Sequence, residues 1–245
     1  MRTTRTAAVL LVLTTLLSGC GAWQSFRTSD FAKEDVTAIV SAAGKAMADV
    51  TSMRLTGQVV ARGTQVLLDL SMGPKGRCTG TLRAGGSHIA IRRVGARAWI
   101  KGDEGVYNSV SDRALPPQVV TRLSTSWIAA DDRSILDLCE LDGYLESFRV
   151  VSLVDGSGKG ARKAGRDTAH AASDVTVEAE ESVDGERVVR LSADTGEVVW
   201  VLSDAPHYVV RVESAVASDG GSLTLSEFNR EVRVEVPAPG DVFRP

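Results

Sequence analysis

Apolar and polar residues alternate with a period of two along two long stretches, residues 52–103 and 175–236. Such alternation is typical of β-strands that have one buried and one solvated face. In the first strand, for example, Leu55 and Val59 occupy one phase and Arg54 the other. The pattern predicts strands over residues 52–63, 65–72, 77–84, 87–95, 97–102, 175–182, 186–192, 197–203, 207–214, 222–228 and 232–236, with a brief extended segment over residues 124–130.

The connections between these strands are short and rich in glycine. Gly85-Gly86 and Asp184-Gly185 are typical hairpin turns, and Gly73-Pro74-Lys75-Gly76 is another turn. Such short links cannot cross over a sheet, so each stretch is expected to form an antiparallel meander. A sheet of about eleven strands rarely stays flat, and we expect this one to curl.

A second pattern, with apolar residues three and four positions apart, predicts helices. It extends from Phe31 through Ile39 to about Asp49, with Asp30 as the expected helix cap. Shorter helices are expected between the two meanders, over residues 103–110, 116–123 and 134–148. Residues 155–174 contain almost no large apolar side chains and are expected to form an exposed loop.

The N-terminus has a different pattern, in which Arg2 and Arg5 precede an apolar run over residues 7–17. As a helix this run would rise about 16 Å, roughly half the hydrocarbon thickness of a bilayer. That length suits a secretory signal peptide and is too short for a transmembrane span. No later run is long and apolar enough to be expected to cross a membrane.

The end of this run, Leu17-Ser18-Gly19-Cys20, resembles the lipobox of bacterial lipoproteins. The resemblance implies cleavage before Cys20 and a diacylglyceryl group on its sulfur, and two acyl chains anchor a protein stably. The alternative is an ordinary secretory signal with an incidental cysteine. We therefore expect a signal peptide over residues 1–19, a lipidated tether over residues 20–31 and one domain over residues 32–245, on the extracytoplasmic face of the cell membrane.

The net charge excludes one class of partner, and the cysteine content indicates a covalent cross-link. The formal net charge is −3, so the chain lacks the basic surface that nucleic acids require. Once Cys20 is assigned to lipid, Cys78 and Cys139 remain. In an oxidising compartment these two are expected to form a disulfide, and the alternative is a pair of buried free thiols.

Signals for catalysis are weak. The histidines His88, His170 and His207 have no metal-ligand spacing, and each is expected to be solvated. The GSGKG segment at residues 156–160 lacks the spacing of a phosphate-binding loop. We expect no enzymatic activity, no cofactor and no metal.

The order of lipobox, helix, meanders and intervening helices resembles the actinobacterial envelope lipoproteins of the LppX/LprG type, which share a half-barrel with the lipoprotein carrier LolA. Residues 88–103, 135–145 and 197–214 carry the likeness, which lies in pattern and order. The resemblance implies an α+β fold: a large curled antiparallel sheet covered on its concave side by the N-terminal helix and the helical insertion.

The resemblance also implies a cavity between sheet and helices that holds lipid acyl chains, and hence a carrier or chaperone for lipid or another apolar ligand. Any single lining candidate can equally be an ordinary core residue. If the core is filled, the same scaffold would instead be an anchored interaction or adaptor module. The candidates for the lining are Leu55, Val59, Val66, Leu68, Leu70, Ile89, Ile91, Val199 and Tyr208, with Trp99 and Trp127 at the mouth.

Basic residues offer a further contact with the membrane. Each basic side chain near an anionic surface contributes about 1 kcal/mol to binding. The alternative role is solubility and protection of strand edges. The residues concerned are Lys159, Arg162, Lys163 and Arg166 in the expected loop, and Arg92, Arg93 and Arg97 nearer the sheet.

Overall fold

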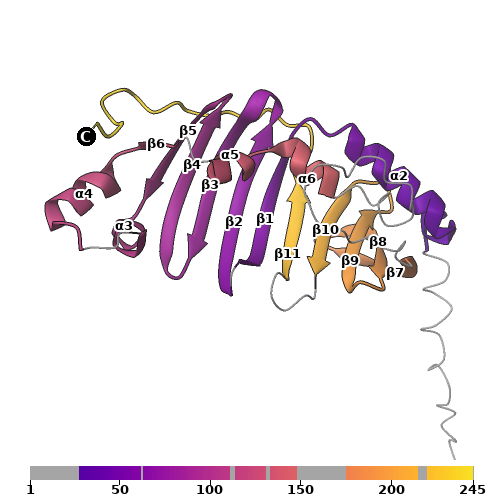
Figure 1. The fold of residues 1–245 in the computed structure, drawn as a ribbon. Helices are drawn as coiled ribbons and strands as arrows, with labels where there is room; N and C mark the ends of the chain where they lie inside the picture. Colours follow the sequence, from indigo (N-terminus) through magenta and orange to yellow (C-terminus); the bar gives the residue numbers. More distant parts are fainter. Residues whose placement is uncertain are drawn as a thin grey trace, which may run out of the picture.

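The computed structural model describes residues 28–61, 63–110, 114–130, 133–147, 175–214 and 220–244. Its strands form one antiparallel sheet of 11 strands in the order β6-β5-β4-β3-β2-β1-β11-β10-β9-β8-β7 (Figure 1). Within each meander, strands that follow each other in sequence are neighbours in the sheet, and β6, which follows α3 and α4, pairs with β5. The pairing of β1 with β11 joins the two meanders and leaves β6 and β7 at opposite edges of the sheet.

The first meander contains β1 (Met53–Ala61), β2 (Thr64–Gly73), β3 (Arg77–Ala84), β4 (Ser87–Val94), β5 (Arg97–Gly102) and β6 (Ile128–Ala130). The second contains β7 (Val175–Val183), β8 (Glu186–Ala193), β9 (Glu197–Leu202), β10 (Val209–Ser214) and β11 (Gly221–Ser226). The helical elements are η1 (Phe31–Lys33), α2 (Val36–Ala48), η2 (Pro74–Gly76), α3 (Glu104–Val110), α4 (Pro117–Thr125), α5 (Arg133–Asp137) and α6 (Leu141–Ser147).

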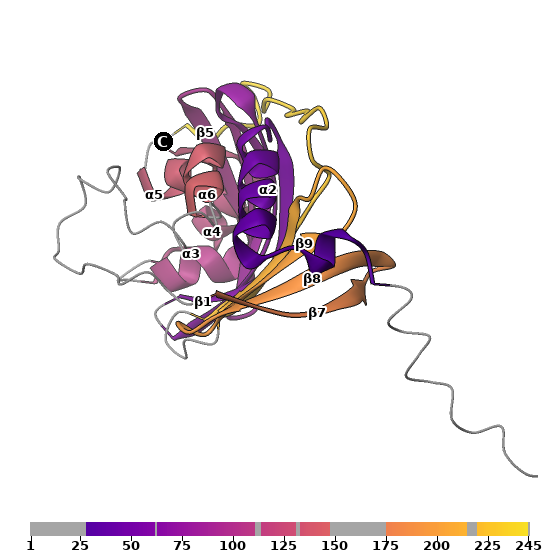
Figure 2. The same ribbon diagram turned by 90° about the vertical axis from the view of Figure 1, so that its right-hand side faces the viewer.

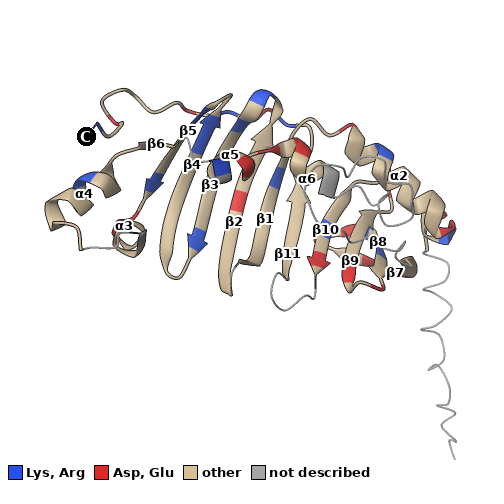
Figure 3. Cartoon of the chain, in the orientation of Figure 1, with Lys and Arg blue, Asp and Glu red and all other residues tan. Residues whose placement is uncertain are grey.

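The sheet curls, and α2, α5 and α6 lie on one side of it (Figure 2). We call the sheet face toward these helices the inner face and the opposite one the outer face. Basic and acidic positions are interspersed along the strands (Figure 3). The fold is the curled α+β half-barrel that the sequence pattern predicts.

The N-terminal helix begins later than its sequence predicts. Asp30 lies in helical geometry at the start of η1 and makes no capping hydrogen bond through its side chain. Asp35 is the cap of α2, because its extended backbone lets the carboxylate accept a hydrogen bond from the Ala38 amide at 3.0 Å. The prediction that Asp30 caps this helix is therefore wrong.

The strand predicted over residues 232–236 is also absent, because this segment is not part of the sheet ladder. Val232 is buried, and the position of a β-carbon on Gly73 would lie 3.1 Å from its side chain. Arg92 in β4 pairs with Glu235 at 3.4 Å. The alternating valines of residues 232–236 therefore belong to a C-terminal segment that packs its side chains against the ends of strands without joining the sheet.

Candidate functional site: the trough between sheet and helices

The inner face is built from rows of residues that lie opposite one another across neighbouring strands. Four such rows cross the first meander; rows 2, 3 and 4 continue onto β11, and row 3 continues onto β10. Row 1 contains Met53, Met72, Cys78, Arg93 and Ala98. Row 2 contains Leu225, Leu55, Leu70, Gly80, Ile91 and Ile100.

Rows 3 and 4 lie nearer the tips of the β1–β2 and β3–β4 hairpins. Row 3 contains Val212, Leu223, Gly57, Leu68, Leu82 and Ile89. Row 4 contains Gly221, Val59, Val66, Ala84 and Ser87. Rows 1, 2 and 3 consist mainly of apolar side chains. Row 4 contains the apolar residues Val59, Val66 and Ala84 and ends in Ser87.

Burial decreases from row 1 to row 4. All of row 1 is buried, and so are Leu55, Leu70, Ile91 and Leu225 of row 2. In row 3 only Leu68 among the apolar side chains is buried, and every member of row 4 is only partly buried. The inner face is therefore apolar over a greater length than the packed core covers.

Helices account for the buried half of this face. Ile39, Val40 and Met47 of α2, with Leu141 and Leu145 of α6, belong to the same hydrophobic cluster as most apolar residues of rows 1 and 2 and Leu68 of row 3. In α2 the apolar residues recur every three or four positions, so one side of the helix can pack continuously on the sheet. We call the space bounded by the inner face and these helices the trough.

The helical insertion is fastened to row 1 by a covalent bond and by a cation. Cys139, after α5, forms a disulfide with Cys78 of β3, which confirms the expected pairing. Arg93 of β4 donates to the carbonyl of Leu136 at 2.7 Å and pairs with Glu140 at 2.6 Å. These contacts fix one end of the roof of the trough to its floor.

Two roles were considered for Arg93, contact with lipid headgroups and solubility or protection of strand edges, and its surroundings fit neither. Its side chain is directed into row 1 and is satisfied by Leu136, Glu140 and the carbonyl of Gly95. A charge this deeply buried requires such partners, and they leave it no role in contacting headgroups.

The N-terminal segment docks on the second meander. The Phe31 ring stacks on His207 with ring centroids 3.8 Å apart, and Phe31 is buried. The backbone amide of Ser29 donates to Glu180 of β7 at 2.8 Å. His207 is therefore partly buried against an aromatic ring, contrary to the expectation of a solvated side chain.

The structure brings most of the predicted lining residues together on the inner face. They divide into a packed group and a partly exposed group. The packed group is Leu55, Leu68, Leu70, Ile91 and Val199. The partly buried group is Val59, Val66, Ile89 and Tyr208.

Tyr208 and the two tryptophans have other surroundings. Tyr208 stacks on Phe228 with centroids 4.2 Å apart, and its hydroxyl accepts a hydrogen bond from Asn229. Trp99 lies opposite Arg92, in the outer phase of β5. The Arg92 guanidinium lies 4.4 Å from the ring centroid of Trp127. The structure thus places Trp99 on the outer face and the Trp127 ring beside Arg92 of that face.

Two hollows lie away from the trough, and sequence reasoning did not identify them. One, of about 890 Å³, lies between the tips of the β1–β2 and β3–β4 hairpins. The other, of about 710 Å³, lies on the outer face and is lined by Thr56, Asp69, Arg211 and other mainly polar residues. Both include Leu67 and Arg83. The sequence did hold a signal, because Leu67 is an apolar residue in the polar phase of its strand.

Several predictions fall on residues that the structure does not describe. Cys20, the signal peptide and most of the tether lie there, as do His170 and the basic residues of the expected loop. Within the described part of the chain, no helix has the length and apolar character needed to cross a bilayer. Among the same residues, no three histidine, cysteine or acidic side chains are grouped so as to hold a metal ion.

Known structures share this architecture. LprF from Mycobacterium bovis superposes with a TM-score of 0.52 at 14% identity, covering 82% of this chain and 96% of that chain. The lipoprotein LppX from Mycobacterium tuberculosis gives a TM-score of 0.48 at 14% identity, covering 82% and 100%. No protein-family model and no curated protein sequence matches the chain. The likeness to LprF is one of fold, and it agrees with the LppX/LprG-type half-barrel expected from the sequence.

Proposed function

We propose that this chain is a non-enzymatic lipoprotein, anchored to the membrane through Cys20, that binds lipid or another apolar ligand in its trough. It would act as a carrier or chaperone in the cell envelope. The observation that supports this best is the partly buried state of rows 3 and 4. Apolar side chains arranged in continuous rows, of which rows 3 and 4 are mostly only partly buried, suit an apolar guest.

The chemistry of such a guest follows from the lining. Val59, Val66, Leu82 and Leu223 offer branched aliphatic surface without a charged group among them. An acyl chain laid along these rows would gain about 0.8 kcal/mol for each methylene group removed from water. A ligand with one or more long alkyl chains therefore fits the trough better than an aromatic or polar ligand.

The proposed anchor is consistent with where the described chain begins. Thr28 precedes Ser29, whose amide is held by Glu180 at the β7 edge of the sheet. Residues 20–28 can span at most about 30 Å when fully extended. A lipid on Cys20 would therefore keep the half-barrel close to the membrane surface, within reach of lipid donors and acceptors.

The cavity proposal is tested by filling the trough. Val66 of row 4 and Leu67 are adjacent in β2 and point to opposite faces of the sheet. Val66→Trp places a large ring in the trough, whereas Leu67→Trp places it outside and is the matched control. Uptake of a long-chain fluorescent fatty acid is expected to fall at least about tenfold in Val66→Trp and to persist in Leu67→Trp, since the lost apolar contacts exceed about 1.4 kcal/mol.

Native mass spectrometry of the wild-type protein purified without added lipid provides an independent readout. A co-purified lipid would support the carrier. A clean apo mass together with no uptake of the fatty acid would reject it and favour the anchored adaptor. Cys20→Ala tests the anchor separately: the protein should leave the membrane fraction or remain unprocessed, and unchanged lipidation would refute the anchor.

A further inference from the structure

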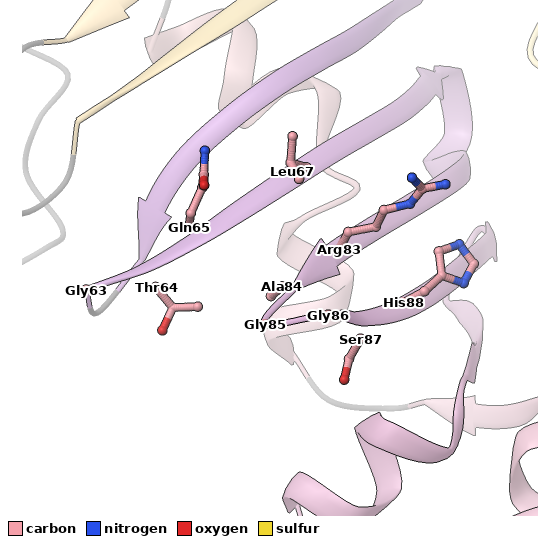
Figure 4. Close-up of a pocket in the computed structure, with 10 residues that line it drawn as sticks. All are labelled: Gly63, Thr64, Gln65, Leu67, Arg83, Ala84, Gly85, Gly86, Ser87 and His88. Carbon is pink, nitrogen blue, oxygen red and sulfur yellow. The ribbon is translucent and has the colours of Figure 1, made fainter.

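The hollow between the β1–β2 and β3–β4 hairpin tips differs in composition from the rest of this acidic protein. Figure 4 shows its lining: Thr64 and Gln65 come from the start of β2, and Arg83 and His88 from β3 and β4. None of its lining residues is aspartate or glutamate. The full lining is Gly63, Thr64, Gln65, Leu67, Arg83, Ala84, Gly85, Gly86, Ser87 and His88.

Arg83 and His88 lie directly opposite each other in the β3–β4 ladder. Residues paired in this way have β-carbons about 5 Å apart on the same face of the sheet. Both side chains therefore reach the outer phase side by side, at the mouth of the hollow. Within the described chain, the Arg83 guanidinium has no hydrogen bond or ion pair.

Several other arginines of the sheet have carboxylate partners, whereas Arg77 and Arg97 have none among the described residues. Arg54, Arg190 and Arg211 pair with Asp69, Glu178 and Glu213 respectively. The lack of such a partner leaves Arg83 available to an external anion.

Carboxylates near this hollow have other partners, and Glu213, which lines the second hollow with Arg83, pairs with Arg211. Asp69 lies two positions beyond Leu67, the residue opposite Arg83, and both of its oxygens accept hydrogen bonds from Arg54, at 2.9 and 2.8 Å. Asp103 accepts from the backbone amides of His88 at 2.7 Å and Val106 at 3.0 Å. Asp69 is thus neutralised by Arg54, and the oxygens of Asp103 are directed at backbone amides rather than at the Arg83 guanidinium.

The remaining lining supplies neutral donors and open backbone. Gln65 shares the outer phase with Arg83 and its amide nitrogen donates to Gln58, while the hydroxyls of Thr64 and Ser87 lie on the inner side of the tips (Figure 4). Gly85 and Gly86 form the hairpin turn with φ values of 57° and 83°, and no atom lies within 4 Å of the position a β-carbon would take on either. A ligand can therefore approach the backbone at this tip closely.

From these features we propose that the hollow binds a phosphate group, with Arg83 and His88 as its principal ligands. A guanidinium matches the geometry of phosphate oxygens through paired N–H donors, and a histidine beside it adds a further donor. At about 890 Å³ the hollow exceeds a bare phosphate, so it accommodates a phosphate ester. Leu67, 49% exposed, provides an apolar wall for the organic part of the ester.

Two sources would present this group. Ala84 and Ser87 belong both to row 4 and to the hollow, so the phosphate of a lipid could bind here while its chains lie in the trough. A soluble phosphate ester is the other source. The site goes beyond the proposed carrier function, because phosphate binding does not require an occupied trough.

The test compares Arg83→Gln and His88→Gln with Arg77→Gln in the full chain. Arg77 and Arg83 are at opposite ends of β3, in the same outer phase, and both are exposed. Binding of glycerol 3-phosphate is measured by calorimetry. Binding to phosphatidylcholine vesicles with and without phosphatidic acid is measured by flotation.

Loss of one charge-assisted contact should weaken binding by about ten- to a hundredfold in the Arg83 and His88 variants. Arg77→Gln should bind as the wild type does. Glycerol 3-phosphate binding with this pattern supports the site and a soluble source, and binding confined to phosphatidic acid vesicles supports the site and a lipid source. No binding in either arm, or equal weakening by Arg77→Gln, overturns the proposal. Because the soluble arm needs no acyl chain, its result is independent of whether the trough binds lipid.

Discussion

Cys78 in β3 and Cys139 between α5 and α6 are joined by a disulfide, with Cα atoms 5.6 Å apart and a separation of 61 positions in sequence. Cys78 is part of the sheet that forms the floor of the trough, and Cys139 is part of the helical segment that forms its roof. The bond therefore fixes the spacing of floor and roof at the closed end, where rows 1 and 2 are buried. Rows 3 and 4, at the other end, have no such constraint within the described residues.

Removing the disulfide should cost much of the stability of the domain. In the double variant Cys78→Ala and Cys139→Ala, the free energy of unfolding is expected to fall by about 4 kcal/mol, because the unfolded chain regains the entropy of a long loop. Urea unfolding of the variant and of the oxidised wild type measures the difference. A change below about 1 kcal/mol would show that the bond does little to restrict the unfolded chain.

Arg93→Gln tests the second fastening of the roof. Its side chain is 10% exposed and contacts Glu140, Leu136 and Gly95. Truncation should lower the free energy of unfolding by about 3 kcal/mol, since buried acceptors lose their donor. Arg187→Gln, which removes an exposed pair with Asp204, is the control and should cost about 0.5 kcal/mol or less. Equal costs would contradict the proposed role of Arg93.

Because of Asp69, the free energy of unfolding should depend slightly on pH in the acidic range. Its hydrogen bonds from Arg54 lower the pKa of this carboxyl below the ordinary value. A lowered pKa in the folded state stabilises the protein above the unfolded pKa, and this contribution is lost as pH falls through the folded pKa. Because the Asp69 side chain is 46% exposed, the contribution is expected to be below about 1 kcal/mol.

Asp69→Asn removes this contribution. Its deficit in unfolding free energy relative to the wild type should be present at about pH 7 and vanish at about pH 2. Parallel stability curves for the two proteins over this range would show that the pair with Arg54 is not coupled to folding.

Gly57 occupies row 3 with a backbone φ of 148°, which side chains rarely adopt. A β-carbon there would overlap the carbonyl oxygen of Ser222 on β11. Gly57→Ala is therefore expected to lower the free energy of unfolding by about 2 kcal/mol or more, at the pairing that joins the two meanders. Gly240→Ala, where a β-carbon meets no atom within 4 Å, is the control in thermal unfolding and should be close to neutral. A neutral Gly57→Ala would show that β1 and β11 can separate without cost.

The strands and their inner faces follow from the sequence because period-two alternation is a local property. Leu55, Leu70 and Ile91 could be assigned to one face before any pairing was known, and glycine turns such as Gly85-Gly86 fixed the order within each meander. The cysteine pair also followed, since only two candidates remained in the domain. The alternation of residues 232–236 misled the prediction because periodicity alone does not supply a partner strand.

Long-range packing decided the rest. The local pattern does not state that β1 pairs with β11, that rows 1 and 2 are more deeply buried than rows 3 and 4, or that Arg93 is buried under α5. It does not reveal that Arg83 and His88 share a hollow without a carboxylate. These features depend on which distant segments meet, and burial and charge pairing arise only once they have met. The sequence by itself thus determined the strands and the polarity of their faces, and the tertiary structure decided where apolar surface and unpaired charge remain.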